Sequence, residues 1–256
     1  MTDRARVSVC MAAHNGERYI KDQLKSILVQ LCSTDEIIVV DDASRDTTVE
    51  IVHDMRDPRI LVIRNERNGG VLAAFERAIR EASGQLIFLS DQDDLWAPNK
   101  VIEFLNAFKA HPEAMVVISD AAIINGRAEV VAQSNFPRWP FRPGLFANLL
   151  HSRFIGCQMA FRSALLPCVL PFPHGLDVLH DIWIGTSNSA IGGVTWYIDM
   201  PLTKYRRHGG NATGVTKLPF RRQMRLRVHL IYALIQSWMR RRRMANSAFA
   251  SKRSQG

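Results

Sequence analysis

Short apolar runs alternate with longer amphipathic segments along most of the chain. The apolar runs that predict strands are residues 7–12, 36–40, 60–63, 86–89, 115–118 and 194–198. The segments with helical spacing are residues 17–31, a stretch starting near residue 46, about 71–82, about 98–110 and 178–190. Strands that alternate with helices of this length predict an α/β fold, with a mostly parallel sheet flanked by helices on both faces.

Local residue preferences suggest where several helices begin and end. Ser44 or Asp46 is expected to cap the second helix, and Gly84 is expected to end the third as a C-terminal glycine. Pro98 suits the first turn of the helix over about 98–110. Residues 134–176 are less regular and are expected to form loops.

Polar clusters follow three of the predicted strands. They are His14-Asn15, Asp41-Asp42 and the acidic run from Asp91 to Asp94. Parallel sheets bind ligands at the carboxyl ends of their strands. We therefore expect the three clusters to meet at one edge of the sheet.

Composition permits a sizeable core and predicts no membrane-spanning helix. The chain has 256 residues, 47% of them hydrophobic, enough for one large domain or a domain with an appendage. It contains no run of 18 apolar residues, and its N-terminus lacks the apolar core of a secretory signal. The four cysteines have no metal-ligand spacing and are expected to be buried thiols. These features predict a cytoplasmic protein.

Charge is distributed unevenly along the chain. The net charge is +9, yet the first 199 residues hold 19 basic and 24 acidic residues, a net charge of −5. After Asp199 there are 14 Lys and Arg and no acidic residue. A cationic C-terminal region indicates a polyanionic partner, either a membrane surface or nucleic acid.

The acidic run Asp91-Gln92-Asp93-Asp94 is the main candidate for chemistry. Carboxylates this close repel one another, and a divalent cation removes that cost. Mg²⁺ and Mn²⁺ prefer oxygen ligands, and Mg²⁺ is usually held by one or two carboxylates together with substrate phosphates. The alternative is a solvated acidic turn that caps the following helix.

Each of the other candidates also has an alternative structural role when taken singly. Asp41 and Asp42 could accept hydrogen bonds from a base or ribose, or cap a helix. The turn over residues 67–70 allows close backbone approach to a ligand, but it lacks a dinucleotide or P-loop pattern. Asp181 could be a general base, although spacing alone favours a helix cap. The basic residues of 205–211 could clamp phosphate in a turn after the last strand, or form ordinary surface charge.

Taken together and in order, these motifs resemble those of the inverting family 2 glycosyltransferases, which have the GT-A fold. Within that family, they are most similar to the bacterial rhamnosyltransferase-like group. The matching segments are residues 13–17, 38–46, 68–70, 89–96, 180–183 and 205–211. The resemblance covers about residues 6–215, which would form the GT-A domain. Its nucleotide-binding part would span about 1–120 and its acceptor-side part about 121–215.

The resemblance implies a role for each matched position. Asp42 or Asp41 would contact the nucleotide base, Asp91 would lie near the ribose, and Asp93 would ligate Mg²⁺ or Mn²⁺ at the diphosphate. Asp181 would be the catalytic base. The family usually has Tyr at position 14, where His14 would stack on the base. The remaining residues expected in the donor site are Asn15, Glu17, Asn68, Gly69, and Arg206 and His208 in a turn over the donor phosphates.

The implied activity is transfer of a sugar, with dTDP-rhamnose as the expected donor, to a hydroxyl of a glycan or lipid-linked acceptor in cell-surface polysaccharide synthesis. One alternative is a sugar-phosphate nucleotidyltransferase, but residues 12–16 lack its glycine-rich basic loop. Another is an inactive nucleotide-sugar-binding scaffold, although the chain retains both Asp93 and Asp181.

The C-terminal extension, residues 216–256, contains a predicted basic amphipathic helix. Its apolar residues recur at steps of three and four, at Met224, Val228, Ile231, Ile235 and Trp238. Arginines lie beside this face, so residues 217–243 are expected to bind an anionic membrane surface. The alternative is packing of the apolar face on the catalytic domain or a partner. We expect no nucleic-acid binding, and a peripheral location on the inner face of the cell membrane.

Overall fold

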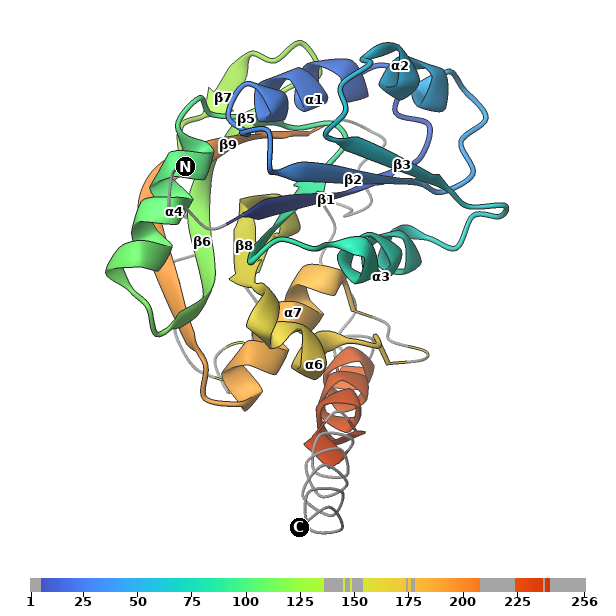
Figure 1. Ribbon diagram of the computed structural model, residues 1–256. Coiled ribbons are helices and arrows are strands. Elements are labelled where there is room, and N and C mark those ends of the chain that lie inside the picture. Colours follow the sequence, from blue (N-terminus) through green and yellow to red (C-terminus); the bar gives the residue numbers. More distant parts are fainter. Residues whose placement is uncertain are drawn as a thin grey trace, which may run out of the picture.

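A computed structural model describes residues 6–135, 154–173, 178–207 and 224–236, together with residues 145, 148, 175, 238 and 239. Within these ranges the chain forms one nine-stranded sheet with helices on both faces (Figure 1). The strand order is β3-β2-β1-β4-β8-β6-β9-β5, and β7 pairs with β6. This architecture confirms the predicted α/β fold.

The first half of the sheet is parallel. Its strands are β1 (Val7–Ala13), β2 (Glu36–Asp41), β3 (Ile60–Arg64) and β4 (Leu86–Asp91). The second half is mixed and contains β5 (Leu95–Trp96), β6 (Ala114–Ile124), β7 (Val130–Ala132), β8 (Met159–Arg162) and β9 (Val194–Arg206). β6 and β9 pair in parallel, whereas β8 runs antiparallel to both β4 and β6.

Helices cover the two faces of the sheet in two groups. The first comprises α1 (Ile20–Leu28), α2 (Thr48–Asp54) and α4 (Lys100–Ala110), and its side chains join one core cluster. The second comprises α3 (Val71–Glu81), α6 (Leu166–Val169) and α7 (His180–Ala190), which share the other cluster. Two short 3₁₀ turns, η2 (Gly156–Gln158) and η3 (Ser163–Leu165), flank β8.

The central strands show why both faces need a covering layer. Side chains alternate between the two faces of a strand. Val9 and Met11 of β1 enter the first core cluster, whereas Cys10 enters the second. Strands with apolar side chains on both faces are typical of buried parallel sheets.

The prediction that residues 134–176 form loops is partly wrong, because this region contains β8. This strand has only four residues and directly follows a 3₁₀ turn, so it gives little periodic signal. β6 and β9 are also longer than the predicted segments, at 11 and 13 residues.

Three predicted helix boundaries are wrong. The N-cap of α2 is Thr47 rather than Ser44 or Asp46, with no side-chain cap bond. Helix α3 is followed by Ala82 in an extended conformation, and Gly84 is required for another reason: a Cβ there would lie 2.7 Å from the Ser8 backbone nitrogen. Pro98 precedes Asn99, the N-cap of α4.

The C-terminal extension contributes a helix over residues 224–236. Leu230 and Ala233 are buried in the second core cluster, together with residues of α6 and α7. The helix then extends away from the body of the molecule (Figure 1). Among the residues that can be described, no helix combines the length and apolarity needed to cross a membrane.

Candidate active site

The register of the parallel strands brings the three polar clusters to one edge of the sheet. Ala13 at the end of β1 is paired with Asp41 in β2. Ala12 is paired with Asp91 in β4. The loops that follow β1, β2 and β4 therefore start side by side, which confirms the expected convergence.

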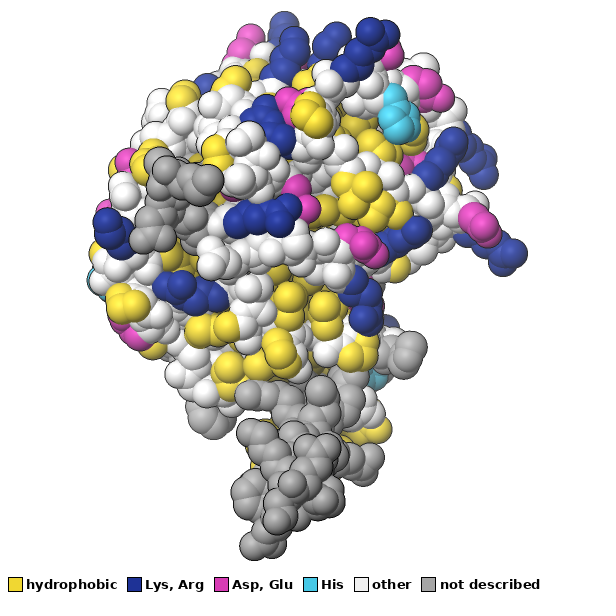
Figure 2. Space-filling model, viewed as in Figure 1, with side chains coloured by type: hydrophobic (Ala, Val, Ile, Leu, Met, Phe, Trp, Pro, Cys, Tyr) yellow, Lys and Arg dark blue, Asp and Glu magenta, His cyan; other side chains and the backbone are white. Residues whose placement is uncertain are grey.

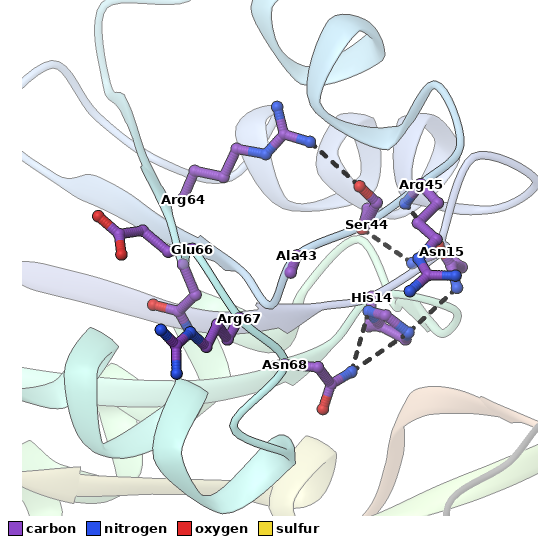
Figure 3. A pocket seen from close by; sticks show the side chains of 10 residues that line it. His14, Asn15, Ala43, Ser44, Arg45, Arg64, Glu66, Arg67 and Asn68 are labelled. Carbon is purple, nitrogen blue, oxygen red and sulfur yellow. Dashed lines mark hydrogen bonds between the residues drawn. The ribbon is translucent and has the colours of Figure 1, made fainter.

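A pocket of about 800 Å³ lies over this edge (Figure 3). The loops after β1, β2 and β3 line it. The lining residues are His14, Asn15, Ala43, Ser44, Arg45, Arg64, Asn65, Glu66, Arg67 and Asn68. The lining contains three arginines and one acidic residue, so the pocket favours an anionic ligand.

Arg45 and Arg64 line the pocket although the sequence motifs did not single them out as site residues. Arg64 is the last residue of β3, and its guanidinium group donates to the Ser44 carbonyl at 3.1 Å. Arg45 lies within a matched segment, but no role was expected for its side chain. A search for every basic residue at a strand end would have found Arg64.

Asp42 organises the turn that follows β3. One carboxylate oxygen accepts from the Gly69 backbone N–H at 2.9 Å and from the Asn65 side chain at 2.8 Å. The other accepts from the Gly70 N–H at 2.7 Å. Gly70 has φ of 84°, a conformation that favours glycine. Asp42 thus fixes the backbone of residues 68–70 beside the pocket.

Asp41 is fully buried but keeps one carboxylate oxygen without a partner among the described atoms. Its Oδ2 accepts from the Ser44 N–H at 3.1 Å and lies 3.6 Å from Nε of Arg64. Its Oδ1 is buried and has no hydrogen-bond partner among the described atoms. A buried acceptor without a partner is costly and marks a place where a ligand donor would be favourable.

His14 and Gln92 join two of the clusters. The Gln92 side chain accepts from the His14 N–H at 2.9 Å and donates to the His14 carbonyl at 3.0 Å. The His14 ring is exposed, with Nδ1 2.8 Å from the Asp42 carbonyl oxygen. The Asn68 amide lies 3.3 Å from the ring nitrogens. The imidazole is therefore fixed in orientation while one side faces the pocket (Figure 3).

Asn15 and Glu17 connect the loop after β1 to the loop before α2. The Asn15 side chain accepts from the Arg45 N–H at 2.9 Å. The Glu17 carboxylate accepts from the Thr47 hydroxyl at 2.8 Å and from its N–H at 3.1 Å. These contacts shape the pocket wall, and direct donor contact by Glu17 stays a prediction.

The acidic run lies near a buried lysine, Lys100. Asp94 is fully buried, and its Oδ1 accepts from the Arg206 backbone N–H at 2.8 Å. Lys100 is also fully buried, and Nζ donates to the Cys157 carbonyl at 2.5 Å and to the Thr203 hydroxyl at 2.8 Å. Desolvation lowers the pKa of Lys100 to about 8, and the nearby carboxylates of Asp94 and Asp91 oppose that shift.

Crowding of carboxylates disfavours their charged forms. Desolvation raises the pKa of Asp94 to about 7, and the Asp93 carboxylate adds to this effect. The pKa of Asp91 is raised well above its usual range, first by desolvation and then by Asp94 and Asp93. A cation at this position would restore the ionised forms.

The carboxylates of the acidic run suit a hard divalent cation. Oxygens of Asp91 and Asp94 and the Cys157 sulfur lie within 4.8 Å of one another, and Asp94 Oδ2 is buried without a hydrogen-bond partner among the described atoms. Burial raises the pKa of the Cys157 thiol, so it stays protonated and is a poor ligand for Mg²⁺. The oxygen donors are therefore the carboxylates of the run.

Asp181 lies in the first turn of α7, whose N-cap is Leu179. The cap role favoured from spacing is therefore wrong. The carboxylate accepts from the Gly156 N–H at 2.8 Å and from the Ile182 N–H at 2.7 Å. Burial nevertheless raises the pKa of Asp181 to about 6. Asp181 is also close enough to Asp91 for its charge to raise the pKa of that residue.

Arg206 does not lie in a turn, because it is the last residue of β9 and is buried. Its Nε donates to the Asp93 carbonyl at 2.6 Å, and one terminal nitrogen donates to the Asn125 carbonyl at 3.2 Å. Arg206 thus supports the backbone of the acidic run. A phosphate contact by Arg206 stays a prediction, and His208 lies outside the described residues.

A sheet whose strand ends carry an anion pocket and a carboxylate run is the architecture of an α/β enzyme that uses a nucleotide. A model of glycosyl transferase family 2 matches residues 8–170. Because this match covers more than half of the 256 residues, the chain belongs to glycosyl transferase family 2.

Two curated relatives come from Escherichia coli. UDP-Glc:alpha-D-GlcNAc-diphosphoundecaprenol beta-1,3-glucosyltransferase WfgD is 29% identical over 182 residues, which are 70% of this chain and 68% of that protein. The putative colanic acid biosynthesis glycosyl transferase WcaA of strain K12 is 28% identical over 190 residues, 70% of this chain and 66% of that protein. The chain thus spans about two thirds of the length of these relatives.

Solved structures show the same fold. S. aureus TarS in complex with UDP-GlcNAc has a TM-score of 0.68 and 22% identity, covering 91% of this chain and 69% of that one. Mannosyltransferase PcManGT from Pyrobaculum calidifontis, in complex with GDP-Man and Mn²⁺, has a TM-score of 0.57 and 21% identity, covering 94% and 65%. These similarities confirm the GT-A fold.

Proposed function

We propose that the chain is an inverting glycosyltransferase that moves a sugar from a nucleotide-diphospho-sugar to a hydroxyl group of a glycan or lipid-linked acceptor in cell-surface polysaccharide synthesis. The observation that carries the proposal is the position of the basic pocket and the acidic run at one sheet edge. A nucleotide in the pocket would direct its diphosphate toward the run. The names of WfgD and WcaA support the polysaccharide context.

Asp181 is the proposed general base. A base is most effective when its pKa lies near the working pH, and burial raises the pKa of Asp181 to about 6. The two backbone N–H groups on its carboxylate fix its orientation. It would accept the proton of the acceptor hydroxyl while that oxygen attacks the anomeric carbon and the nucleoside diphosphate leaves. This single displacement inverts the anomeric configuration.

Asp93 and Asp91 are the proposed ligands of a divalent cation, Mg²⁺ or Mn²⁺. When bound, the cation neutralises charge on the diphosphate leaving group. The complex of PcManGT with GDP-Man and Mn²⁺ supports the presence of a divalent cation. Asp94 anchors the run to the backbone of β9 through Oδ1, while its Oδ2, which is buried without a partner among the described atoms, is a further candidate ligand beside Asp91.

His14 is proposed to stack on the nucleotide base, since its exposed ring borders the pocket and is oriented by Asn68. Asp41 is the better candidate for a polar contact to the nucleotide because one of its oxygens has no partner among the described atoms. Asp42 would act through the turn of Asn68 and Gly69, whose backbone it holds.

The names of the relatives narrow the choice of donor sugar. The expected dTDP-rhamnose has no counterpart in the names of these relatives and structures, which mention UDP-Glc, UDP-GlcNAc and GDP-Man. We propose that all four nucleotide-sugars be compared, with UDP-Glc as the first candidate.

Thermal shifts with each nucleotide-sugar and Mn²⁺, followed by hydrolysis assays on the ligands that bind, test the proposal. We expect one nucleotide-sugar to stabilise the protein and to be hydrolysed slowly without an acceptor. Binding without any turnover, even with a polyprenyl-diphosphate-sugar acceptor, would indicate an inactive scaffold. Release of pyrophosphate from a nucleoside triphosphate and a sugar phosphate would indicate a nucleotidyltransferase.

A further inference from the structure

The helix over residues 224–236 exposes a continuous apolar stripe, which also includes residues 238 and 239. The main members of the stripe, Val228, Ile231, Ile235 and Trp238, are 44–58% exposed. Met224 and Met239 extend it at either end, at 40% and 41% exposed. Spacing of three and four residues places the first four side chains in one row along the helix.

This stripe does not attach the helix to the protein. The side chains that do so are Leu230 and Ala233, which are buried in the core cluster shared with α6 and α7. Successive helical residues are rotated by about 100°, so these two lie roughly opposite Val228 and Ile235. The helix therefore has two apolar faces, of which only one is used within the described part of the chain.

The charge around the stripe has one sign. Arg225 and Arg227 lie on the same helix, and the neighbouring sequence adds Arg221, Arg222 and residues 240–243. The chain contains no acidic residue after Asp199. A partner of this surface must therefore accept apolar side chains and a dense positive charge together.

We propose that the stripe binds an anionic lipid bilayer, with the helix lying in the interface between headgroups and acyl chains. A helix with apolar residues on one side and arginines beside them suits that position. Hydrophobic side chains also gather on the body around α6, near the start of this helix (Figure 2).

Two other occupants fit less well. A second copy of the chain would bring two arginine-rich helices together, and like charges at close range oppose association. Nucleic acid would satisfy the arginines but leave the exposed Val, Ile and Trp side chains unused. The lipid surface alone satisfies both the charge and the apolar stripe.

The bilayer proposal does not depend on the proposed sugar transfer, because it requires no nucleotide. Flotation of the full chain with phosphatidylethanolamine–phosphatidylglycerol vesicles, and with phosphatidylcholine vesicles, tests it directly. We expect binding to the anionic vesicles only, with a decrease at high salt. A variant with Val228→Ser, Ile231→Ser and Ile235→Ser should lose at least about tenfold in partitioning.

A matched control removes three exposed apolar side chains elsewhere, with Val29→Ser, Ile102→Ser and Val131→Ser. It should float like the unmodified chain. Far-UV circular dichroism and thermal unfolding verify that both variants are folded. As a second measurement, brominated lipids should quench tryptophan fluorescence of the unmodified chain, and Trp238→Phe should remove most of that quenching.

Several results would overturn the proposal. Equal flotation of the stripe variant and the unmodified chain would show that the stripe is not the contact. Equal binding to neutral and anionic vesicles would show that the arginines have no role. Light scattering that reports a dimer dissociated by the stripe substitutions, with no flotation of the unmodified chain, would identify a second copy as the occupant.

Discussion

Asp181 has an environment that sets both its orientation and its proton affinity. Two backbone N–H groups hold its carboxylate, while burial raises its pKa to about 6. As a general base Asp181 must be deprotonated. We therefore expect kcat to rise with pH through about 6 and to level off above it, in a pH profile measured with saturating donor and metal.

Asp181→Asn keeps the size of the side chain but removes the base. Loss of the general base should lower kcat by about 10²–10⁴-fold and abolish the inflection near pH 6 in the plot of kcat against pH. Donor binding, measured by calorimetry, should change little because Asp181 is proposed to contact the acceptor. Near-normal turnover with intact donor binding would exclude Asp181 as the base.

Lys100 is the buried cation behind the acidic run. Removing one partner of a buried charge cluster leaves the others uncompensated. We expect Lys100→Met to lower the free energy of unfolding by about 3 kcal/mol, measured by urea denaturation. Lys109→Met, at an exposed position of the same helix, should have almost no effect. Equal stability of the two variants would mean that Lys100 is not needed as a counter-ion.

The acidic residues at the strand ends could be predicted from the sequence, but the residues that contact the site from distant parts of the chain could not. The acidic residues after β2 and β4 follow directly from the chain, since a strand pattern ends where they begin. The contacts of Lys100 with Thr203, and of Asp94 with Arg206, join positions more than 100 residues apart. A pattern of neighbouring residues cannot predict contacts between positions so far apart in the sequence. For the same reason, Arg206 was expected in a turn, although it ends β9 and contacts the acidic run.

At the scale of elements, Gly16 connects the loop after β1 to the loop after β4. A Cβ at this position would lie 2.1 Å from Gln92 Oε1. The Gln92 carboxamide is at the end of a flexible side chain, so it can move, but only by breaking its two bonds with the His14 backbone.

We therefore expect Gly16→Ala to reduce stability by only about 1 kcal/mol and to weaken nucleotide binding about tenfold, measured by calorimetry. Gly126→Ala is a suitable comparison, because the added Cβ would lie 3.4 Å from the Tyr19 hydroxyl. If Gly16→Ala bound nucleotide normally, the link between Gln92 and His14 would have no part in the donor site.

The elements themselves were largely predictable where they are long and periodic. All six predicted strands are present, because buried parallel strands give continuous apolar runs. The antiparallel β8 was missed because four residues carry no clear period. β8 matters for the site, since the η2 turn before it supplies the Gly156 N–H that holds Asp181.

At the scale of the whole molecule, the C-terminal extension packs on the catalytic body. We still propose a GT-A domain over 1–215, with parts of about 1–120 and 121–215, and a separate extension over 216–256. However, Leu230 and Ala233 of the extension complete the second core cluster. The extension is therefore a structural part of the catalytic body as well as an appendage. Sequence periodicity found its exposed face but gave no sign that another face is buried.

Two neighbouring residues of this helix allow the two faces to be separated. Leu230 is 3% exposed, whereas Ile231 is 44% exposed. Leu230→Ala should remove buried apolar contacts with the body and lower the free energy of unfolding by about 2–3 kcal/mol. Ile231→Ala should change stability by less than about 0.5 kcal/mol, because its side chain is largely exposed already. Urea denaturation of both variants, without lipid, measures the difference. Similar small effects would mean that the helix does not pack on the body in solution, and the proposed boundary at 215 would then mark an independent extension.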